Sequence, residues 1–338
     1  MMSDAPPAER SVTLFSYDDN GLSKEETTVA QALEAIGRRR MTWISIRGKI
    51  EADLLETVGS RLGVDPYEII SMMGFSKGRA RVEDLGNAAF VIWSTPMKVN
   101  DAMENDSAAF LLGPDFLISI QYGEGHYVEV VKRLSNERSR LRRGGPGLLL
   151  YSILNATAED FFDRVEDLAD AIGELEDDIM AGSGANALGK VGRMRGRVTS
   201  IRREVWPLRE AASALSDRQI SVVRTGERTY FAELFSDLDL LLHEVDSLNQ
   251  IIPQLIDLYE SNTSRQLNQI VKVLTVFSVV FAPMTLIAAI YGMNFEHMPE
   301  LGHSLGYPLA LLLMLLVSTF MLIYFHRKGW LTFGEKRD

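Results

Sequence analysis

The chain has 338 residues, of which 46% are apolar, and a formal net charge of −11 from 35 basic and 46 acidic side chains. This length allows two domains. The absence of cysteine from the sequence excludes a disulfide scaffold, a cysteine-ligated metal site and a thiol nucleophile. The acidic balance argues against nucleic acid as a partner, because phosphate would be repelled unless one strongly basic face compensated.

The first part of the chain mixes strand and helix patterns. Residues 1–10 have neither the apolar core of a secretory signal nor an Arg-rich transit pattern, and we expect them to be disordered. Residues 11–150 are expected to form a cytoplasmic α+β domain, a mixed sheet with flanking helices. The turn at 113–115 predicts a hairpin. Strands are predicted at 11–17, 42–48, 88–94 and 116–122, and helices at 51–62 and 127–141.

The next region, 151–228, is predicted to be a charged helical hairpin. Residues 159–178 hold ten acids and one base, and residues 190–209 hold seven bases and one acid. Because the Gly-rich stretch 182–189 separates them, we expect antiparallel helices with complementary faces. A second interpretation is that the acidic helix concentrates divalent cations, but exposed carboxylates bind ions loosely without a closed cage.

The third helical segment carries apolar residues that alternate three and four positions apart. This is a heptad pattern over four repeats, and it predicts packing against other helices of the same or another protomer. No stop signal follows Tyr259, so one helix is expected over 229–291. The pattern consists of Phe231, Leu234, Leu238, Leu241, Val245, Leu248, Ile252, Leu255 and Tyr259.

Two apolar runs near the C-terminus, 270–291 and 307–325, predict two transmembrane helices. The first has 22 residues. A helix of that length spans about 33 Å, enough for a bilayer core of about 30 Å. The loop 292–306 is so short that the two helices must form a hairpin. A buried hairpin of a soluble protein is the weaker alternative.

Flanking charge predicts the orientation of these helices. Arg265 and Lys272 lie at the start of the first run and the basic tail 326–338 follows the second, whereas the connecting loop has no Lys or Arg. The positive-inside rule therefore places both termini in the cytoplasm. A bacterial inner (plasma) membrane is the simplest location for such a multi-pass chain.

Within the first run, small and hydroxyl residues recur every three or four positions. One interpretation is close helix packing in lipid, which small residues favour. The other is a water-filled pore lined by this face, which needs several copies around an axis because two spans cannot enclose a pore. The face consists of Asn268, Val271, Thr275, Ser278, Ala282, Thr285 and Ala289.

The outer end of the first run reads Tyr291-Gly292-Met293-Asn294 and continues as Phe-Glu-His-Met-Pro-Glu-Leu up to Leu301. This resembles the CorA family of magnesium transporters, whose signature is Gly-Met-Asn at the end of the first of two C-terminal membrane helices, often followed by Phe-x-x-Met-Pro-Glu-Leu. The resemblance extends over most of the chain, although the first 150 residues match in organisation more than in motif.

The resemblance implies a homopentameric funnel that carries Mg²⁺, and also Co²⁺ or Ni²⁺, across the membrane and is gated by cytoplasmic Mg²⁺. Gly292, Met293 and Asn294 would then form a selectivity filter, because Mg²⁺ sheds its waters reluctantly and oxygen acceptors can hold the hydrated ion. Glu296 and Glu300 would raise the local cation concentration. A helix C-cap is the structural alternative for Asn294.

The resemblance also implies regulatory Mg²⁺ bound by carboxylates between protomers. Counting back from Gly-Met-Asn places one such acid at Glu233, where the family commonly has Asp, with Asp257 further along the same helix. We expect the N-terminal partners to be Glu83 and Asp84. The alternative for each is an ordinary solvated acid.

Two other functions remain open. A zinc transporter of the ZntB branch shares Gly-Met-Asn but tends to continue differently, and the stretch Phe295–Leu301 favours the magnesium branch. A membrane-anchored coiled-coil scaffold would need neither Gly-Met-Asn nor a polar stripe. The five histidines show no metal-ligand spacing, and no catalytic site is expected.

Overall fold

The computed structural model describes residues 11–18, 21–48, 52–65, 67, 79–99, 102–121, 127–182, 186–294 and 298–330, without the side chains of 95–99, 102–107, 300 and 301. The chain divides into two compact units. The first unit consists of Met1–Asp177 and Leu188–Gln254, and the second of Asp178–Ala187 and Leu255–Asp338.

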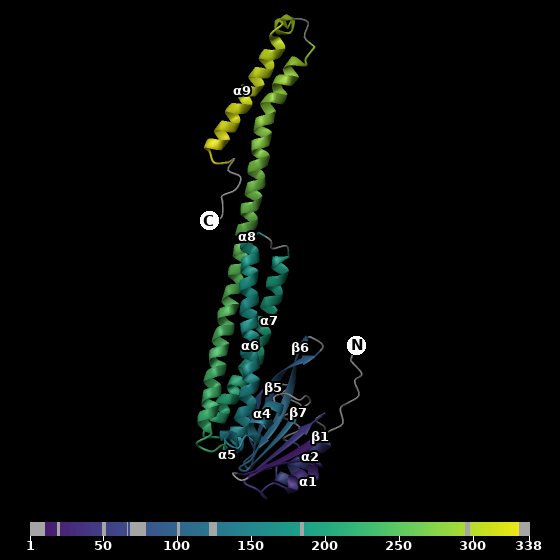
Figure 1. Ribbon diagram of the computed structural model, residues 1–338, viewed down its shortest axis with the longest axis vertical. Coiled ribbons are helices and arrows are strands. Elements are labelled where there is room, and N and C mark those ends of the chain that lie inside the picture. The colour runs from purple at the N-terminus through teal and green to yellow at the C-terminus, as the bar shows by residue number, and fades with distance from the viewer. Residues whose placement is uncertain are drawn as a thin grey trace. The chain divides into compact units, whose positions relative to one another are not determined.

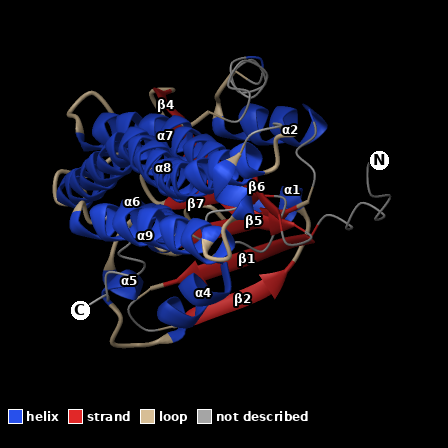
Figure 2. Ribbon diagram, turned by 90° about the horizontal axis from the view of Figure 1, so that it is seen from above, coloured by secondary structure: helices blue, strands red, loops and turns tan. Residues whose placement is uncertain are grey.

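A seven-stranded mixed sheet forms one part of the first unit (Figure 2). Its order is β2-β1-β3-β7-β6-β5-β4, and every neighbouring pair is antiparallel except β3 and β7. The expected mixed sheet and the hairpin turn at 113–115 are therefore confirmed. The strands are β1 (Ser11–Tyr17), β2 (Leu22–Glu26), β3 (Met41–Arg47), β4 (Arg81–Asp84), β5 (Ala89–Val99), β6 (Ala102–Leu112) and β7 (Phe116–Gln121).

Helices cover both faces of this sheet. On one face, α1 (Val29–Glu34) and α2 (Ala52–Leu62) bury apolar side chains against Ile44 and Ile118. On the other face, the ring of Tyr127 packs against Phe15 and Trp43 at centroid distances of 5.8 and 5.6 Å. Because β3 has helices on both sides, every residue from Met41 to Ile46 is buried, rather than every second one.

The helix predicted over 127–141 is instead two helices, α4 (Tyr127–Ser135) and α5 (Arg140–Arg143). Asn136 Oδ1 accepts a hydrogen bond from the Arg138 backbone N–H at 3.1 Å. Ser139 Oγ accepts one from the Leu141 N–H at 3.2 Å and so caps α5. These polar side chains offer the backbone an alternative to the helix, which the apolar periodicity did not reveal.

Three long helices complete the first unit: α6 (Pro146–Met180), α7 (Ala187–Ser216) and the first part of α8 (Arg228–Tyr291) (Figure 1). The heptad prediction is confirmed, because Phe231 to Ile252 are 0 to 8% exposed at every heptad position. The neighbours of these residues are helices of the same chain. The Tyr151 ring of α6, for example, meets the Phe231 ring of α8 edge-on at a centroid distance of 6.4 Å.

The predicted hairpin of α6 and α7 is also present. Its best-buried ion pair, however, joins the one basic residue of the acidic segment to the one acidic residue of the basic segment. Arg164 is the lone base of the acidic segment, and its Nη1 lies 3.1 Å from the carboxylate of Glu204, the lone acid of the basic segment. Two bases of α7 reach α8 instead, Arg202 to Asp246 at 3.0 Å and Arg209 to Asp239 at 2.6 Å.

Besides the connection Asp178–Ala187, the second unit contains the remainder of α8, a short 3₁₀ helix at Pro299–Gly302 and α9 (Gly306–Arg327). Phe325 near the end of α9 packs against Val276 and Val280 of α8. Both α8 and α9 contain segments long and apolar enough to cross a membrane. Most of their other apolar side chains in these segments face outward: Leu274 is 63% exposed and Leu315 is 62% exposed.

Candidate functional site

The two sides of α8 in the second unit differ in chemistry. One side, centred on Val276, Val280 and Met284, packs against α9. At about 100° per residue, the stripe of small and hydroxyl residues lies about 180° around the helix from that contact. Six of its seven residues are exposed and Thr275 is half-buried: Asn268, Val271, Thr275, Ser278, Ala282, Thr285 and Ala289.

Two hydroxyl groups of the stripe are oriented by their own helix. Thr275 Oγ1 donates a hydrogen bond to the Val271 carbonyl at 2.7 Å, and Thr285 Oγ1 donates to the Phe281 carbonyl at 3.0 Å. Since each hydroxyl hydrogen points back at the backbone, the oxygen lone pairs remain free as acceptors. Acceptors of this kind suit the water shell of a hydrated cation, whose outer atoms are hydrogens.

Bulky residues gather away from the stripe. The rings of Phe277 and Phe281 stack at 4.4 Å. With Val273, Leu322 and Trp330 they line an apolar hollow of about 200 Å³ between α8 and α9. The exposed surface of α8 is therefore divided into a narrow, mildly polar face and a wide, aromatic one.

The Gly-Met-Asn motif follows directly after α8. The Gly292 N–H still donates to the carbonyls of Ala288 and Ala289, at 3.0 and 3.2 Å. A Cβ on Gly292 would lie 3.3 Å from the Ala288 oxygen, which a small shift would relieve. The local backbone therefore does not require glycine here, and the open approach from outside is the feature that a side chain would remove.

Asn294 is exposed and does not have the left-handed backbone typical of an Asn that closes a helix. Among the described non-glycine residues, only Asn186 has a positive φ. The C-cap alternative therefore has no support at Asn294. Glu296 and the side chain of Glu300 lie outside the described part of the chain.

The four candidate regulatory acids are not brought together within one chain. Glu233 lies in the first unit and Asp257 in the second, and both are exposed on α8. Glu83 pairs with Arg81 at 3.2 Å. Asp84 accepts hydrogen bonds from the Gly86 N–H at 2.9 Å and the Ser221 N–H at 3.1 Å.

Among the described residues of a single chain, no group of three or more potential metal-ligating side chains occurs. Asp84 would have to release Ser221 to bind an ion with both of its oxygens. Glu233 nevertheless affects a neighbouring side chain. Burial raises the pKa of Tyr151, and the negative charges of Glu233 and Asp237 raise that pKa further.

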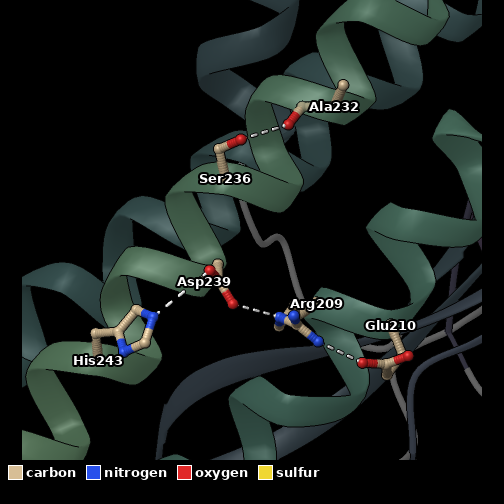
Figure 3. Close-up of polar contacts among 6 residues, drawn as sticks. All are labelled: Arg209, Glu210, Ala232, Ser236, Asp239 and His243. Atoms are coloured by element: carbon tan, nitrogen blue, oxygen red, sulfur yellow. Dashed lines mark hydrogen bonds and ion pairs between the residues drawn. The ribbon is translucent and has the colours of Figure 1, made fainter.

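Sequence reasoning missed a polar network that joins α7 to α8 (Figure 3). Arg209 Nε donates to Asp239 Oδ1 at 2.6 Å, and its Nη1 donates to Glu210 at 2.6 Å. His243 Nε2 lies 3.7 Å from the second Asp239 oxygen. The spacing of Asp239 and His243 was visible in the sequence, but nothing there indicated Arg209 as their partner.

Sequence reasoning also missed a buried carboxylate, Glu227, which directly precedes α8 and lies against the start of α6. Glu227 is 6% exposed and packs on the backbone of Gly145 and Gly147. A Cβ on either glycine would come within 2.5 Å of a Glu227 oxygen, so both positions exclude a side chain. The run Gly144-Gly145-Pro146-Gly147 was the available signal.

Comparisons with known proteins agree with this arrangement. The model of the family described as "CorA-like Mg2+ transporter protein" matches residues 39–327. The chain is 29% identical over 293 residues to the "Cobalt/magnesium transport protein CorA" of Thermotoga maritima. The aligned residues make up 86% of this chain and 83% of the relative.

Two solved structures are similar in fold. The CorA magnesium transporter of Methanocaldococcus jannaschii superposes with a TM-score of 0.74 at 20% identity, over 95% of this chain and 98% of that one. The ZntB cytoplasmic domain of Vibrio parahaemolyticus superposes with a TM-score of 0.59 at 12% identity, over 75% of this chain and 98% of that one.

Proposed function

The chain belongs to the CorA-like Mg²⁺ transporter family, and we propose that it is a channel that takes up Mg²⁺, and also Co²⁺ or Ni²⁺, across the plasma membrane. The observation that carries this proposal is the exposed polar stripe of α8, which lies opposite the α9 contact and ends at Gly292 and Asn294. A relative named for cobalt and magnesium transport supports the choice of ions.

One stripe cannot enclose a pore, so the proposal requires a ring of copies, and we propose a homopentamer. In such a ring α8 lies inside and α9 outside, because α9 already covers the side of α8 away from the stripe. Small residues on the inner face allow close approach of the copies and leave room for a hydrated ion.

Asn294 and the Gly292 carbonyl form the entrance in this proposal. The Asn294 amide oxygens accept hydrogen bonds from the water shell of Mg²⁺, which costs less than stripping that shell. Glu296 and Glu300 add negative charge nearby. The basic residues on either side of the two spans favour an inner-membrane location with both termini cytoplasmic.

For regulation, we propose that cytoplasmic Mg²⁺ closes the channel by neutralising carboxylates between copies, with Glu233 and Asp257 on α8 and Glu83 or Asp84 on the sheet. Unpaired acids facing each other repel, and a divalent ion relieves that repulsion. The double variant Glu233→Gln with Asp84→Asn should therefore conduct without dependence on cytoplasmic Mg²⁺.

A matched control for that variant is Ser221→Ala, which weakens the Asp84 contact but keeps the charge. It should retain Mg²⁺ dependence. If millimolar Mg²⁺ closes the double variant as it closes the parent, the sensor lies elsewhere. If Ser221→Ala loses the dependence as well, Asp84 acts by holding the loop before α8 and not as a ligand.

The function is tested by reconstituting the full chain in liposomes and measuring Mg²⁺, Co²⁺ and Zn²⁺ influx with and without a pH gradient. Passive Mg²⁺ and Co²⁺ influx is the expected result. Zn²⁺ influx driven by the pH gradient would instead favour a zinc transporter of the ZntB branch. No flux of any ion would favour a membrane-anchored scaffold.

A further inference from the structure

A tryptophan projects from the outer side of α7 in the first unit. Trp206 is 51% exposed. The Arg209 guanidinium lies 5.6 Å from its ring centre, and the hydrogen bonds to Asp239 and Glu210 hold that guanidinium in place (Figure 3). Arg203, one helical turn earlier, is also exposed. Trp and Arg are among the residues in which interface hot spots are enriched.

A groove of complementary chemistry lies between α6 and α8 of the same unit. It has a volume of about 440 Å³, which is enough for an indole ring. Its floor is apolar, and the exposed carboxylates Glu166 and Glu244 stand at its edge. The lining residues are Phe162, Val165, Glu166, Ala169, Glu244, Ser247 and Leu248.

The two features stand at the same level along the three-helix bundle. The pair Arg164–Glu204 aligns α6 with α7, which places Trp206 opposite the turn that contains Phe162. The pair Arg202–Asp246 aligns α7 with α8 in the same way, next to Glu244. No residue of α7 lines the groove, so Trp206 cannot reach the groove of its own copy.

We propose that Trp206 of one copy inserts into the α6–α8 groove of the next copy, with Arg203 against the carboxylates of Glu166 and Glu244. A projection and a receptor at the same level on two sides of one subunit form a head-to-tail contact, which closes into a ring about an axis along the helices. The inference rests on the proposed homo-oligomer and deepens it by naming the contact surface.

The proposal also accounts for the uneven charges of α6 and α7. Exposed bases on α7, such as Arg195 and Arg197, and exposed acids on α6, such as Asp170 and Glu174, would face each other between copies. This explains why the best-buried pair within one chain joins the two exceptions, Arg164 and Glu204. Complementary rows also steer the copies into register.

The test uses the full-length chain, which has no cysteine of its own. Thr199→Cys places a thiol on the exposed side of α7 two turns before Trp206, and Ser247→Cys places one in the groove. A bismaleimide should link the double variant into a ladder of intermolecular products up to a closed ring, since its spacer relaxes the short distance that a disulfide requires. Each single variant alone should give no ladder, and a mixture of the two should give dimers.

Three further changes in the double-cysteine chain sharpen the result. Trp206→Ala should slow cross-linking by about tenfold, because hot-spot residues carry most of the binding energy. Val128→Ala removes an equally exposed apolar residue of α4 and should have no effect. Arg203→Glu should slow cross-linking, and adding Glu166→Arg should restore it.

Light scattering on the same samples separates this inference from the proposed function. An oligomer of unchanged mass that gives no ladder, or a Trp206→Ala chain that links as fast as its parent, overturns the named contact and leaves the channel proposal standing. A monomer under all conditions overturns both. A ladder that depends on Trp206 and on the charge swap supports the contact.

Discussion

The two parts of α8 have the same backbone geometry and opposite surroundings. Up to Gln254, in the first unit, the apolar side chains recur at heptad spacing and are buried, as with Leu238 at 0% exposure. From Leu267 onward, in the second unit, apolar side chains occur all round the helix and are mostly exposed, as with Ile270 at 64% and Leu274 at 63%; Val276 and Val280, which pack against α9, are exceptions. A narrow apolar stripe is covered by two helices of the same chain, whereas a helix that is apolar all round needs lipid or other copies.

The largest expected effect comes from truncating one leucine in each part. Leu238→Ala removes a fully buried side chain from the three-helix bundle and should lower the free energy of unfolding of the first unit by about 2–5 kcal/mol. Leu274→Ala removes an exposed one and should change it by less than about 0.5 kcal/mol. Urea unfolding followed by tryptophan fluorescence measures both. Equal losses would show that the contrast in burial does not govern stability.

The next prediction addresses the end of the exposed part. Asn294→Ala removes one amide acceptor per copy and touches no core, so the oligomer should stay intact while Mg²⁺ flux falls. A hydrogen bond is worth about 1 kcal/mol, and several copies lose one each, so the fall should exceed about tenfold. Thr285→Val, deeper in the stripe, should reduce flux less. If Asn294→Ala conducts Mg²⁺ nearly as fast as the parent, the proposal that Asn294 forms the pore entrance is wrong.

The smallest expected effect concerns the core of the first unit. Tyr17 is 0% exposed, and its hydroxyl has no hydrogen-bond partner among the described residues. Burial raises its pKa well above the ordinary 10.0; Arg40 opposes the rise and Glu227 adds to it. Above that ordinary value the unfolded chain loses the Tyr17 proton while the folded chain keeps it, so the first unit should lose stability as pH rises.

Tyr17→Phe removes both the titration and the unpaired hydroxyl. Its stability at pH 7 should differ from the parent by less than about 1 kcal/mol, and its loss between pH 9 and pH 11 should be smaller than the parent's. Thermal unfolding across that range measures the difference. An identical loss of stability in both proteins would mean that the Tyr17 hydroxyl is in contact with water despite its burial.

The elements that the sequence predicted are those with strong apolar periodicity. Strands β1, β3, β5 and β7 have such runs, whereas β2 (Leu-Ser-Lys-Glu-Glu) and β4 (Arg-Val-Glu-Asp) are polar and short. These two lie at the edges of the sheet, where only one neighbour constrains them. Propensity has little to detect at such positions.

The candidate site divides in the same way. The stripe and Gly-Met-Asn are local patterns, so spacing alone located them on α8 and directly after it. The contacts of Asp84 with Ser221 and of Arg209 with Asp239 join residues 137 and 30 positions apart. Nothing local marks such partners, because a solvated acid and a paired acid have the same sequence signature.

The central claim, that the polar stripe of α8 faces water, is tested most directly by single cysteines in this cysteine-free chain. Asn268→Cys, Ser278→Cys and Thr285→Cys should react with a water-soluble thiol reagent in the reconstituted protein about tenfold faster than Phe277→Cys and Phe281→Cys, because only hydrated thiols ionise and react readily. Added Mg²⁺ should slow the reaction at the three stripe positions alone. Equal rates at all five positions, or faster reaction at Phe277→Cys and Phe281→Cys, would contradict the account.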